Sequence, residues 1–281
     1  VDKYSKALND ALNYRIYAEH WYLDVLTDEK WECLVFGDYE AIMPIPLQFK
    51  FGFKFVLQPI YCQQLGVFYK EEISDELFKE FEKKLHKYRV RAYHFNEENT
   101  ERYNPEGEKR VNYVLDLNRP YEEIKTEFKE KRKKDINRAK NKNLVIEESS
   151  DFSVYHLFQN QHYPHLKRIS EMGVNEKLIQ ELKNRKKLKL LYIKYEEAYI
   201  ACQVFNFSLN RIYCMTFYRD KEFDKYNSSA FIKNYLMQTE SNQNKLDFDG
   251  SMISGVATFI EGFGAEKKEF SVYSNFKISF Q

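Results

Sequence analysis

An acidic residue, a glycine and a serine follow one another near the C-terminal end of the sequence, in Asp249-Gly250-Ser251. The residues before them predict a short strand that breaks at Gly250, and Ser251 predicts the N-cap of a helix that Gly264 ends. A strand end, a tight turn and a helix N-terminus together present backbone N–H groups that can bind a polar ligand. Asp249 could orient an amine there or accept its proton, and the alternative is an Asp that only stabilises the turn. Ser251 is interpreted as a cap rather than a nucleophile, because no G-x-S-x-G motif surrounds it.

Three glutamines lie in or beside an apolar, strand-like run, at Gln58, Gln63 and Gln64. Amides in such a place must bond to each other, to the backbone or to a ligand. The functional interpretation is that they line a pocket for an acceptor substrate. The structural interpretation is that they bond within the protein.

A run of basic residues lies in the middle of the chain. It comprises Lys129, Lys131, Arg132, Lys133, Lys134, Arg138, Lys140 and Lys142. Such a run is either a solvated helix face or a surface that attracts an anion, such as a tRNA end or the diphosphate of a lipid-linked precursor. Arg132 and Arg138 are the candidate anion ligands, because guanidinium binds phosphate in a bidentate manner. No aromatic residues interleave with the run and the net charge of the chain is only +1, so DNA is not an expected partner.

Metal and disulfide chemistry are not expected. The four cysteines are dispersed singly in apolar runs, at Cys33, Cys62, Cys202 and Cys214. This distribution is typical of reduced, buried thiols. The His-Tyr-Pro-His run at 162–165 has a spacing that a metal could use, but its proline breaks the helix and no nearby cysteine or carboxylate completes a ligand set.

The length and the hydropathy pattern predict an α/β chain of two domains, 1–142 and 143–281. The first domain is expected to contain helical residues from 3 to 26, strands at 31–36, 39–46 and 53–60, a helix from the N-cap Ser74 to 85, strands at 89–95 and 111–117 with a loop at 96–109 between them, and one long helix from 120 to 140. The second is expected to contain a strand at 144–146, helices at 154–163 and 175–186, strands at 188–193, 198–207 and 211–217, and a helix at 228–240 before the Asp249 junction.

Several segments together resemble the Fem-type aminoacyl and peptidyl transferases. Residues 246–270 resemble the F-[DE]-x-x-G-S…G…F…FG segment of that family. Residues 16–24, 37–46 and 58–68 resemble the first domain of an uncharacterised bacterial branch, and residues 132–144 resemble the interdomain helix. The resemblance implies two tandem GNAT-like domains (the acyl-CoA N-acyltransferase fold), each with a mixed, twisted sheet flanked by helices.

The resemblance also implies an N-acyltransferase that moves an acyl or aminoacyl group to an amine. The donor would be aminoacyl-tRNA, acyl-CoA or another activated acid, and the acceptor would be a small molecule or a cell-envelope precursor. No further cofactor is implied. Backbone N–H groups at a splayed strand would polarise the donor carbonyl. Positioning of the two substrates would supply much of the remaining rate, so a dedicated base need not exist.

The donor-binding residues expected from the resemblance are Tyr218, Asn227, Ser228 and Ser229. Acyl-CoA enzymes of this fold usually carry [RQ]-x-x-G-x-[GA] here, whereas residues 219–230 contain no glycine. Because glycines let the backbone close on a pyrophosphate, tight binding of CoA is not expected. Asn227 and the two serines either bind a phosphate or carboxylate weakly or only cap the helix. The alternative function is a catalytically inactive GNAT-like module that binds a ligand or a protein.

No segment reaches the roughly 18 continuous apolar residues of a membrane span. The N-terminal residues lack a signal-peptide pattern. A cytoplasmic location is therefore expected, and the sequence leaves the oligomeric state open.

Overall fold

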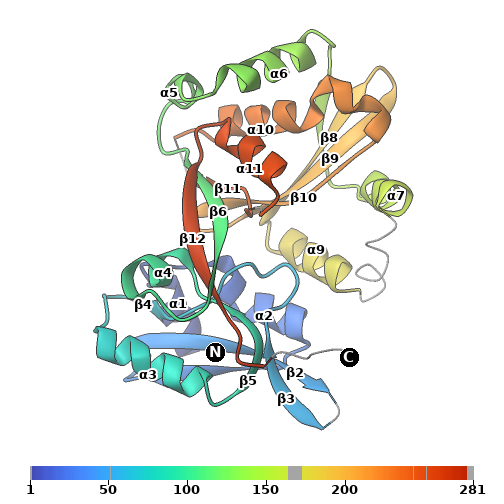
Figure 1. The fold of residues 1–281 in the computed structure, drawn as a ribbon. Helices are drawn as coiled ribbons and strands as arrows, with labels where there is room; N and C mark the ends of the chain where they lie inside the picture. Colours follow the sequence, from blue (N-terminus) through green and yellow to red (C-terminus); the bar gives the residue numbers. More distant parts are fainter. Residues whose placement is uncertain (1, 51, 164–172, 243, 251, 277–281) are drawn as a thin grey trace. The chain divides into compact units, whose positions relative to one another are not determined.

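The computed structural model describes residues 2–50, 52–163, 173–242, 244–250 and 252–276. The chain divides into two compact units: the first comprises Val1–Val111 and Lys268–Gln281, and the second comprises Asn112–Lys267. Each unit contains strands of a mixed sheet with helices against it (Figure 1). This confirms the predicted α/β class.

The first unit has the strand order β1-β2-β3-β5-β12, and β4 pairs with β2. Its elements are α1 (Asp2–Asn9), the 3-10 helix η1 (Ile16–Ala18), α2 (His20–Thr27), β1 (Trp31–Phe36), β2 (Ala41–Lys50), β3 (Phe53–Leu57), β4 (Phe68–Tyr69), α3 (Asp75–Leu85), β5 (Arg89–His94), α4 (Glu97–Tyr103) and the later part of β12 (Glu266–Tyr273). β3 and β5 are parallel. The predicted N-cap Ser74 is confirmed, because its Oγ accepts a hydrogen bond from the Leu77 N–H at 3.2 Å.

The loop predicted at 96–109 contains a helix, α4. Asn96 caps this helix, because its Oδ1 accepts from the Asn99 N–H at 2.8 Å. In the first turn, Glu97 is buried and lies 3.3 Å from Nη2 of the buried Arg15. The sequence pattern missed α4 because the helix packs through polar contacts rather than through an apolar stripe.

The second unit has the strand order β6-β11-β10-β9-β8-β7. Its elements are the later part of β6 (Glu108–Asp116), α5 (Tyr121–Thr126), α6 (Glu130–Lys140), β7 (Val145–Ser149), α7 (Ser153–His162), α9 (Val174–Asn184), β8 (Leu188–Tyr195), β9 (Ala198–Phe207), β10 (Arg211–Arg219), the 3-10 helix η3 (Lys221–Tyr226), α10 (Ser228–Thr239), β11 (Lys245–Asp247) and α11 (Ser254–Glu261). β10 and β11 are parallel, and β9 is antiparallel to both β8 and β10.

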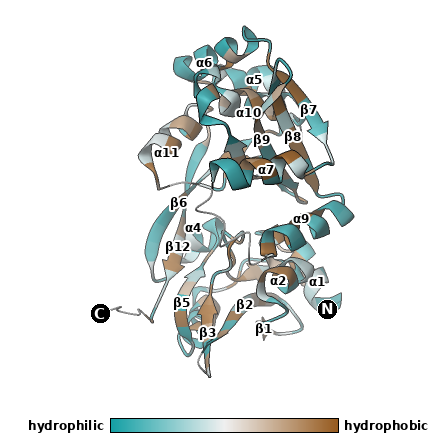
Figure 2. Ribbon diagram, turned by 90° about the vertical axis from the view of Figure 1, so that its right-hand side faces the viewer, coloured by the Kyte–Doolittle hydropathy of each residue, from teal (hydrophilic) through white to brown (hydrophobic). Residues whose placement is uncertain are grey.

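The two faces of the second unit's sheet are covered by different helices. Val204 and Tyr218 belong to a buried cluster with residues of α7 and α9. Their neighbours Gln203 and Phe217 contact Lys233 of α10 instead, because successive side chains of a strand point to opposite faces. Strands β8 and β9 are hydrophobic over much of their length, whereas α6 is largely hydrophilic (Figure 2).

The single helix predicted from 120 to 140 is two helices, α5 and α6. Between them, the ring of Phe128 packs edge-on against Phe263, with 5.3 Å between the ring centroids. The Lys129 N–H donates to the Gly262 carbonyl at 2.9 Å. These contacts hold Lys129 in an extended conformation, which separates the two helices.

The two compact units do not divide at residue 142, where the sequence pattern places the domain boundary. α6 packs against α10 in the second unit, and β6 pairs with β11 there. The chain returns to the first unit through β12, where Val272 and Tyr273 pair with β5. Pairing between segments far apart in the sequence sets these limits, and no local pattern signals it.

Candidate functional site

β10 has a parallel neighbour along only part of its length. β11 pairs with β10 over three residue pairs, and the last joins Tyr213 to Asp247. β10 then continues to Arg219 beside β9, with a register irregularity between Cys214 and Thr216. Among the described residues, no strand lies on the β11 side of β10 beyond Tyr213. Such a splayed strand edge can direct backbone N–H groups at a bound carbonyl.

A cavity of about 470 Å³ lies at the start of α10, and we call it the cationic cavity. It is lined by Lys131, Arg132, Asp135, Arg138, Arg219, Asp224, Asn227, Ser228, Ser229, Ala230, Gly255, Thr258 and Phe259. Four of these side chains are cationic and two are anionic, so the lining is net positive. The cavity brings together five residues that the sequence predicts as ligands: Arg132, Arg138, Asn227, Ser228 and Ser229.

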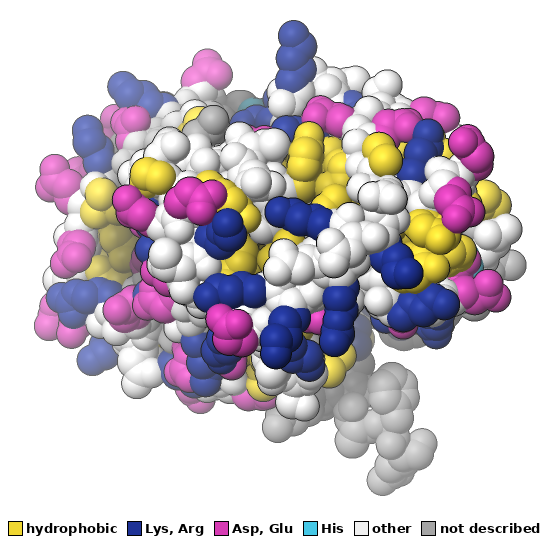
Figure 3. All heavy atoms as spheres, turned by 90° about the horizontal axis from the view of Figure 1, so that it is seen from above, with side chains coloured by type: hydrophobic (Ala, Val, Ile, Leu, Met, Phe, Trp, Pro, Cys, Tyr) yellow, Lys and Arg dark blue, Asp and Glu magenta, His cyan; other side chains and the backbone are white. Residues whose placement is uncertain are grey.

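Any attraction of this cavity for an anion is local. On the face shown in Figure 3, Lys and Arg side chains are interspersed with Asp and Glu. The net charge of the chain is +1. The molecule therefore lacks a long-range positive field, and only a ligand that reaches the cavity experiences its charge.

The two predicted arginines differ in how firmly the protein holds them. Arg132 is buried, and its Nη1 lies 2.8 Å from Asp135. Its guanidinium lies over the Phe259 ring, 4.0 Å from the centroid, and burial lowers the pKa of Arg132 while Asp135 opposes this. The Arg138 side chain is 70% exposed and 3.9 Å from Asp135. Arg138 is therefore the better placed of the two to turn toward a bound anion.

Arg219 is the third arginine of the cationic cavity. It forms an ion pair with Asp224, and the hydrogen bonds of that pair raise the pKa of Arg219. The sequence pattern did not single it out. The sequence feature that could have identified Arg219 is its place at the end of β10, where the glycine-free segment begins.

The N-terminus of α10 contributes to the cavity without a capping side chain. Asn227 has a left-handed backbone (φ 56°, ψ 37°) and makes no capping bond, and its Nδ2 donates to the Lys225 carbonyl at 3.3 Å. Asn227 holds the N-cap position of α10, since its carbonyl accepts from the Phe231 N–H at 3.1 Å, but its side chain does not cap the helix. A role in binding a phosphate or carboxylate stays a prediction. Backbone N–H groups in the first turn of a helix lack intrahelical partners, and the helix dipole is positive at this end. The start of α10 is therefore suited to a negative group.

A second cavity of about 400 Å³ adjoins the first, and we call it the apolar cavity. It is lined by Gln203, Cys214, Met215, Phe217, Arg219, Ser229, Lys233, Phe248, Gly255, Val256, Phe259 and Ile260. The residues common to both linings are Arg219, Ser229, Gly255 and Phe259. The two cavities together can hold a ligand that has an anionic part and a largely apolar part.

The apolar cavity also contains Lys233, which the sequence pattern did not single out. Its side chain is buried, and its Nζ donates to Gln203 Oε1 at 3.0 Å and to Ser229 Oγ at 3.1 Å. Burial lowers the pKa of Lys233. The sequence feature that could have identified Lys233 is its position one helical turn after Ser229, on an otherwise apolar face of the helix.

Tyr218 lies on the opposite face of β10 from Phe217 and Arg219. Its ring packs against Tyr155 and Tyr163, with centroid distances of 5.0 and 4.8 Å. The structure does not place it in the lining of either cavity. Its two neighbours line the apolar cavity instead, as the period-two alternation of a strand requires.

Asp249 lies in the turn that follows β11. Its backbone is left-handed, at φ 58°, and its N–H donates to Asp247 Oδ1 at 2.9 Å. Asp247 also accepts from Arg211 at 2.7 Å and from Asn112 at 3.0 Å. These bonds tie the turn to the sheet, and Asp249 is not part of the two cavity linings. The catalytic role of Asp249 stays a prediction. The predicted cap Ser251 lies outside the described residues, and the helix after the turn, α11, begins at Ser254.

The three predicted glutamines lie in the first unit and bond within the protein. Gln64 Nε2 donates to Gln63 Oε1 at 2.8 Å and to Glu97 Oε1 at 3.2 Å. Gln58 Nε2 donates to the Cys62 carbonyl at 2.8 Å, and its Oε1 accepts from the His94 N–H at 3.1 Å. These bonds agree with the structural interpretation, and their role in an acceptor pocket stays a prediction.

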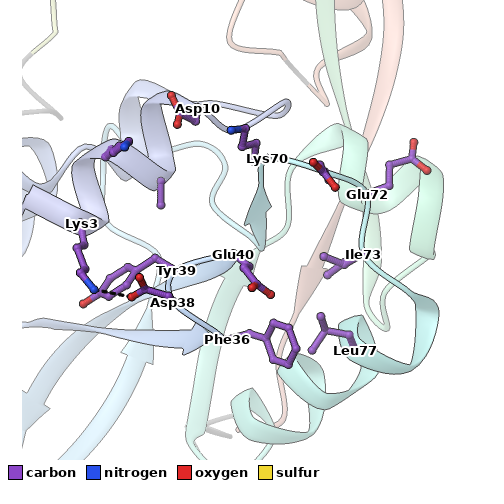
Figure 4. A pocket seen from close by; sticks show the side chains of 13 residues that line it. Lys3, Asp10, Phe36, Asp38, Tyr39, Glu40, Lys70, Glu72, Ile73 and Leu77 are labelled. Carbon is purple, nitrogen blue, oxygen red and sulfur yellow. Dashed lines mark hydrogen bonds and ion pairs between the residues drawn. The ribbon is translucent and has the colours of Figure 1, made fainter.

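The first unit has a cavity of about 680 Å³ at its surface (Figure 4). Lys3 Nζ bonds there to Asp38 Oδ1 at 2.6 Å. Lys70 and Glu72 also line the cavity. Five of its lining side chains are acidic and three are basic, so the lining is net negative and does not suit the phosphate of an acyl donor. None of the predicted site residues belongs to it.

The described residues contain neither a candidate metal site nor a candidate membrane span. Within the described residues, no group of three or more His, Cys, Asp or Glu could hold a metal ion, and residues 164 and 165 of the histidine run lie outside that part. Burial raises the pKa of Cys202 and Cys214 to about 12. Each helix in the described part of the chain is too short or too polar to span a bilayer.

Comparison with protein-family models finds no match, and comparison with curated proteins finds none either. Among solved structures, FemX is 10% identical and superposes with a TM-score of 0.68 over 97% of this chain and 95% of that one. L-PGS from Bacillus licheniformis is 14% identical, with a TM-score of 0.54 over 99% and 93% of the two chains. A tandem GNAT protein from the clavulanic acid biosynthesis pathway is 8% identical, with a TM-score of 0.54 over 99% and 97%. These similarities confirm the expected fold, a Fem-like pair of GNAT-type domains.

Proposed function

We propose that this protein is a Fem-like N-acyltransferase that transfers an acyl or aminoacyl group to an amine. One observation carries the proposal: a cationic cavity and an apolar cavity share part of their lining on one face of the second unit. Activated acyl donors such as aminoacyl-tRNA and acyl-CoA combine a phosphate group with an acyl carbonyl. The joined cavities match this combination.

In the proposed complex, the donor's phosphate occupies the cationic cavity. Arg138 and the first-turn N–H groups of α10 are its ligands, and Arg132 supplies positive charge from a fixed position. The acyl or aminoacyl part enters the apolar cavity between Phe217 and Phe259. Gly255 lies at the junction, because it lines both cavities.

The donor carbonyl lies at the edge of β10 beyond Tyr213 in this proposal. Backbone N–H groups at this edge stabilise the negative charge that develops on the carbonyl oxygen when an amine attacks. The acceptor is an amine on a small molecule or a cell-envelope precursor. The glycine-free segment, which forms η3 and the left-handed Asn227, makes a tRNA end a better candidate donor than CoA, because a pyrophosphate is usually bound by a glycine-rich loop.

A binding experiment tests the location of the donor site. Aminoacyl-tRNA, uncharged tRNA, CoA and acetyl-CoA are added separately, and thermal unfolding is followed. A donor present at about 100 times its Kd is expected to raise Tm by roughly 5 °C. Gly255→Leu fills the junction and is expected to abolish the shift, since a Cβ at Gly255 meets nothing within 4 Å and the fold should be unaffected. Lys177→Leu, at an exposed site on α9, is the matched control and should retain the shift.

A transfer experiment separates the enzyme from a binding module. Radiolabelled acyl groups on tRNA or CoA are offered with a panel of primary amines, and labelled amide is counted. Transfer by the unmodified protein that Gly255→Leu abolishes supports the proposal. Donor binding without transfer to any amine would instead indicate the catalytically inactive binding module. A protein that no donor stabilises and that transfers nothing would overturn the proposal.

A further inference from the structure

The apolar cavity contains a lysine whose polar partners are neutral. Lys233 is 6% exposed, and its Nζ bonds to the amide oxygen of Gln203 and the hydroxyl of Ser229. The nitrogen also lies 5.0 Å from the ring centroid of Phe217 and 5.7 Å from that of Phe259. Within the described residues, no carboxylate forms an ion pair with Lys233. A buried ammonium without a counter-ion is costly.

The charges around Lys233 act on its pKa in both directions, and burial outweighs them. From α6, Arg132 repels a second positive charge, and the positive end of α10 acts in the same direction. From β10, the thiol of Cys214 acts in the opposite direction and raises the pKa of Lys233. Arg219, also from β10, lines the same cavity. The carboxylates of Asp247 and Asp249 act on Cys214. Burial is the largest influence, and it lowers the pKa of Lys233.

The hydrogen bonds of Lys233 leave one position on its nitrogen for a ligand. Nζ is tetrahedral, and its bond to Cε and its contacts with Gln203 and Ser229 occupy three of the four directions. An uncharged amine can donate both hydrogens to these two oxygens and keep its lone pair for the fourth direction. We propose that Lys233 is the group that takes a proton from the acceptor amine in the apolar cavity, an inference that rests on the proposed N-acyl transfer.

The proposed step balances as follows. The acceptor enters as an ammonium and gives one proton to Lys233 Nζ, which becomes an ammonium. The freed amine attacks the donor carbonyl carbon, so a C–N bond forms and the C–O bond of a tRNA ester or the C–S bond of a thioester breaks. The second proton of the attacking nitrogen passes to the leaving oxygen or sulfur. Lys233 then releases its proton to solvent, and no oxidant or reductant is required.

The protonation state of Lys233 can be measured without any activity assay. Lysine labelled with ¹³C at Cε is incorporated, and the resonance of Lys233 is identified by its loss in Lys233→Met. Its titration midpoint is expected to lie below the ordinary lysine value of about 10.4. Gln203→Glu adds a carboxylate at the Lys233 nitrogen with little change in volume and is expected to raise the midpoint. A midpoint at or above the ordinary value in the unmodified protein would overturn the proposal.

Kinetics then test the role itself. Lys233→Met is expected to lower kcat/KM by about 100-fold or more and to remove the rise of kcat/KM with pH that deprotonation of Lys233 produces. Lys233→Arg should not restore the rate, because guanidinium does not deprotonate. In Lys233→Ala, trimethylamine is expected to restore the rate in proportion to its free base, since a tertiary amine can accept a proton but cannot form the amide. Lys177→Met, on the exposed side of α9, is the matched control.

The failures of the two proposals differ. If the unmodified protein transfers no acyl group from any donor, the proposed function fails and the role of Lys233 fails with it. If transfer occurs and Lys233→Met and Gln203→Glu both transfer at the unmodified rate, only the role of Lys233 is overturned. Mass spectrometry after incubation with the donor alone gives a further test, because an acyl group on Lys233 would make it a nucleophile instead. Gln203→Glu keeps the test valid if Lys233→Met does not fold.

Discussion

The imidazole of His94 shows how a single residue acquires its chemistry from its surroundings. Its Nδ1 lies 2.7 Å from the Gln63 carbonyl, and its ring lies against Phe270. Burial lowers the pKa of His94 to about 4, with the Gln63 bond opposing the shift and Arg110 adding to it. At neutral pH the ring is therefore uncharged, and Nδ1 carries the hydrogen that it donates to Gln63.

This buried ring predicts an acid-sensitive first unit. Between the ordinary pKa of 6.5 and about 4, the unfolded chain binds the proton more readily than the folded one. The contribution of the neutral His94 ring to the free energy of unfolding is therefore fully present above about pH 6.5 and is lost as pH falls through 4. This contribution is on the order of 3 kcal/mol in all. NMR titration of the His94 ring should give a midpoint near 4, and His94→Gln should reduce the loss of stability between pH 7 and pH 4.5. A midpoint near 6.5 would contradict this prediction.

The sequence identified several residues of the candidate site as ligands, but it did not show that they lie next to one another. Arg132 and Arg138 stood out because a guanidinium suits phosphate, and Asn227 because it precedes a helix. The cationic cavity brings all three together. Lys233 was overlooked because nothing local shows that Gln203, from another element, is its partner.

Among the elements, α6 and α11 meet where a glycine makes room for an arginine. A Cβ at Gly262 would lie 3.0 Å from Arg132 Nε and 3.1 Å from the Phe259 carbonyl oxygen. Arg132 is also held by Asp135 and by the Phe259 ring. The close approach of the two helices therefore depends on the missing side chain at Gly262.

Two alanine substitutions separate packing from helix propensity at α11. Gly262→Ala is expected to lower the free energy of unfolding by about 1–3 kcal/mol, because Arg132 must shift. Gly255→Ala, where a Cβ meets nothing within 4 Å, is expected to raise it by up to about 1 kcal/mol through helix propensity. Urea denaturation measures both changes. Equal effects at the two glycines would show that Arg132 can move freely.

Elements with a strong apolar period agree with the sequence prediction, and elements held by polar or long-range contacts do not. α3 begins after its predicted cap Ser74, and its apolar positions Phe78, Phe81 and Leu85 are buried. α4 was not predicted because its first turn packs through Glu97 and Arg15. The break between α5 and α6 depends on Phe263, from a distant part of the chain.

At the scale of the whole molecule, the chain leaves the first compact unit and later returns to it. β6 carries it into the second unit and β12 carries it back. A fragment of residues 112–267 should therefore fold, because it keeps β6 beside β11 and α6 against α10. A fragment of 143–281, the predicted domain, lacks both and exposes the apolar surface of α10.

The two fragments can be compared directly. We expect residues 112–267 to show dispersed amide resonances and a cooperative thermal transition by circular dichroism. We expect residues 143–281 to show neither. Cooperative folding of 143–281 together with failure of 112–267 would support the boundary at residue 142 that the sequence pattern predicts.

The order and type of most helices and strands follow from the sequence alone, because period and caps act between residues close in the chain. The resemblance of residues 246–270 added the expectation of a doubled GNAT-like fold, which the structural similarities confirm. The limits of the two units, the joined cavities and the neutral partners of Lys233 were decided by tertiary structure. The physical reason is that burial and charge compensation depend on which distant segments meet, and α6, β9, β10 and α11 meet at this site only in the folded chain.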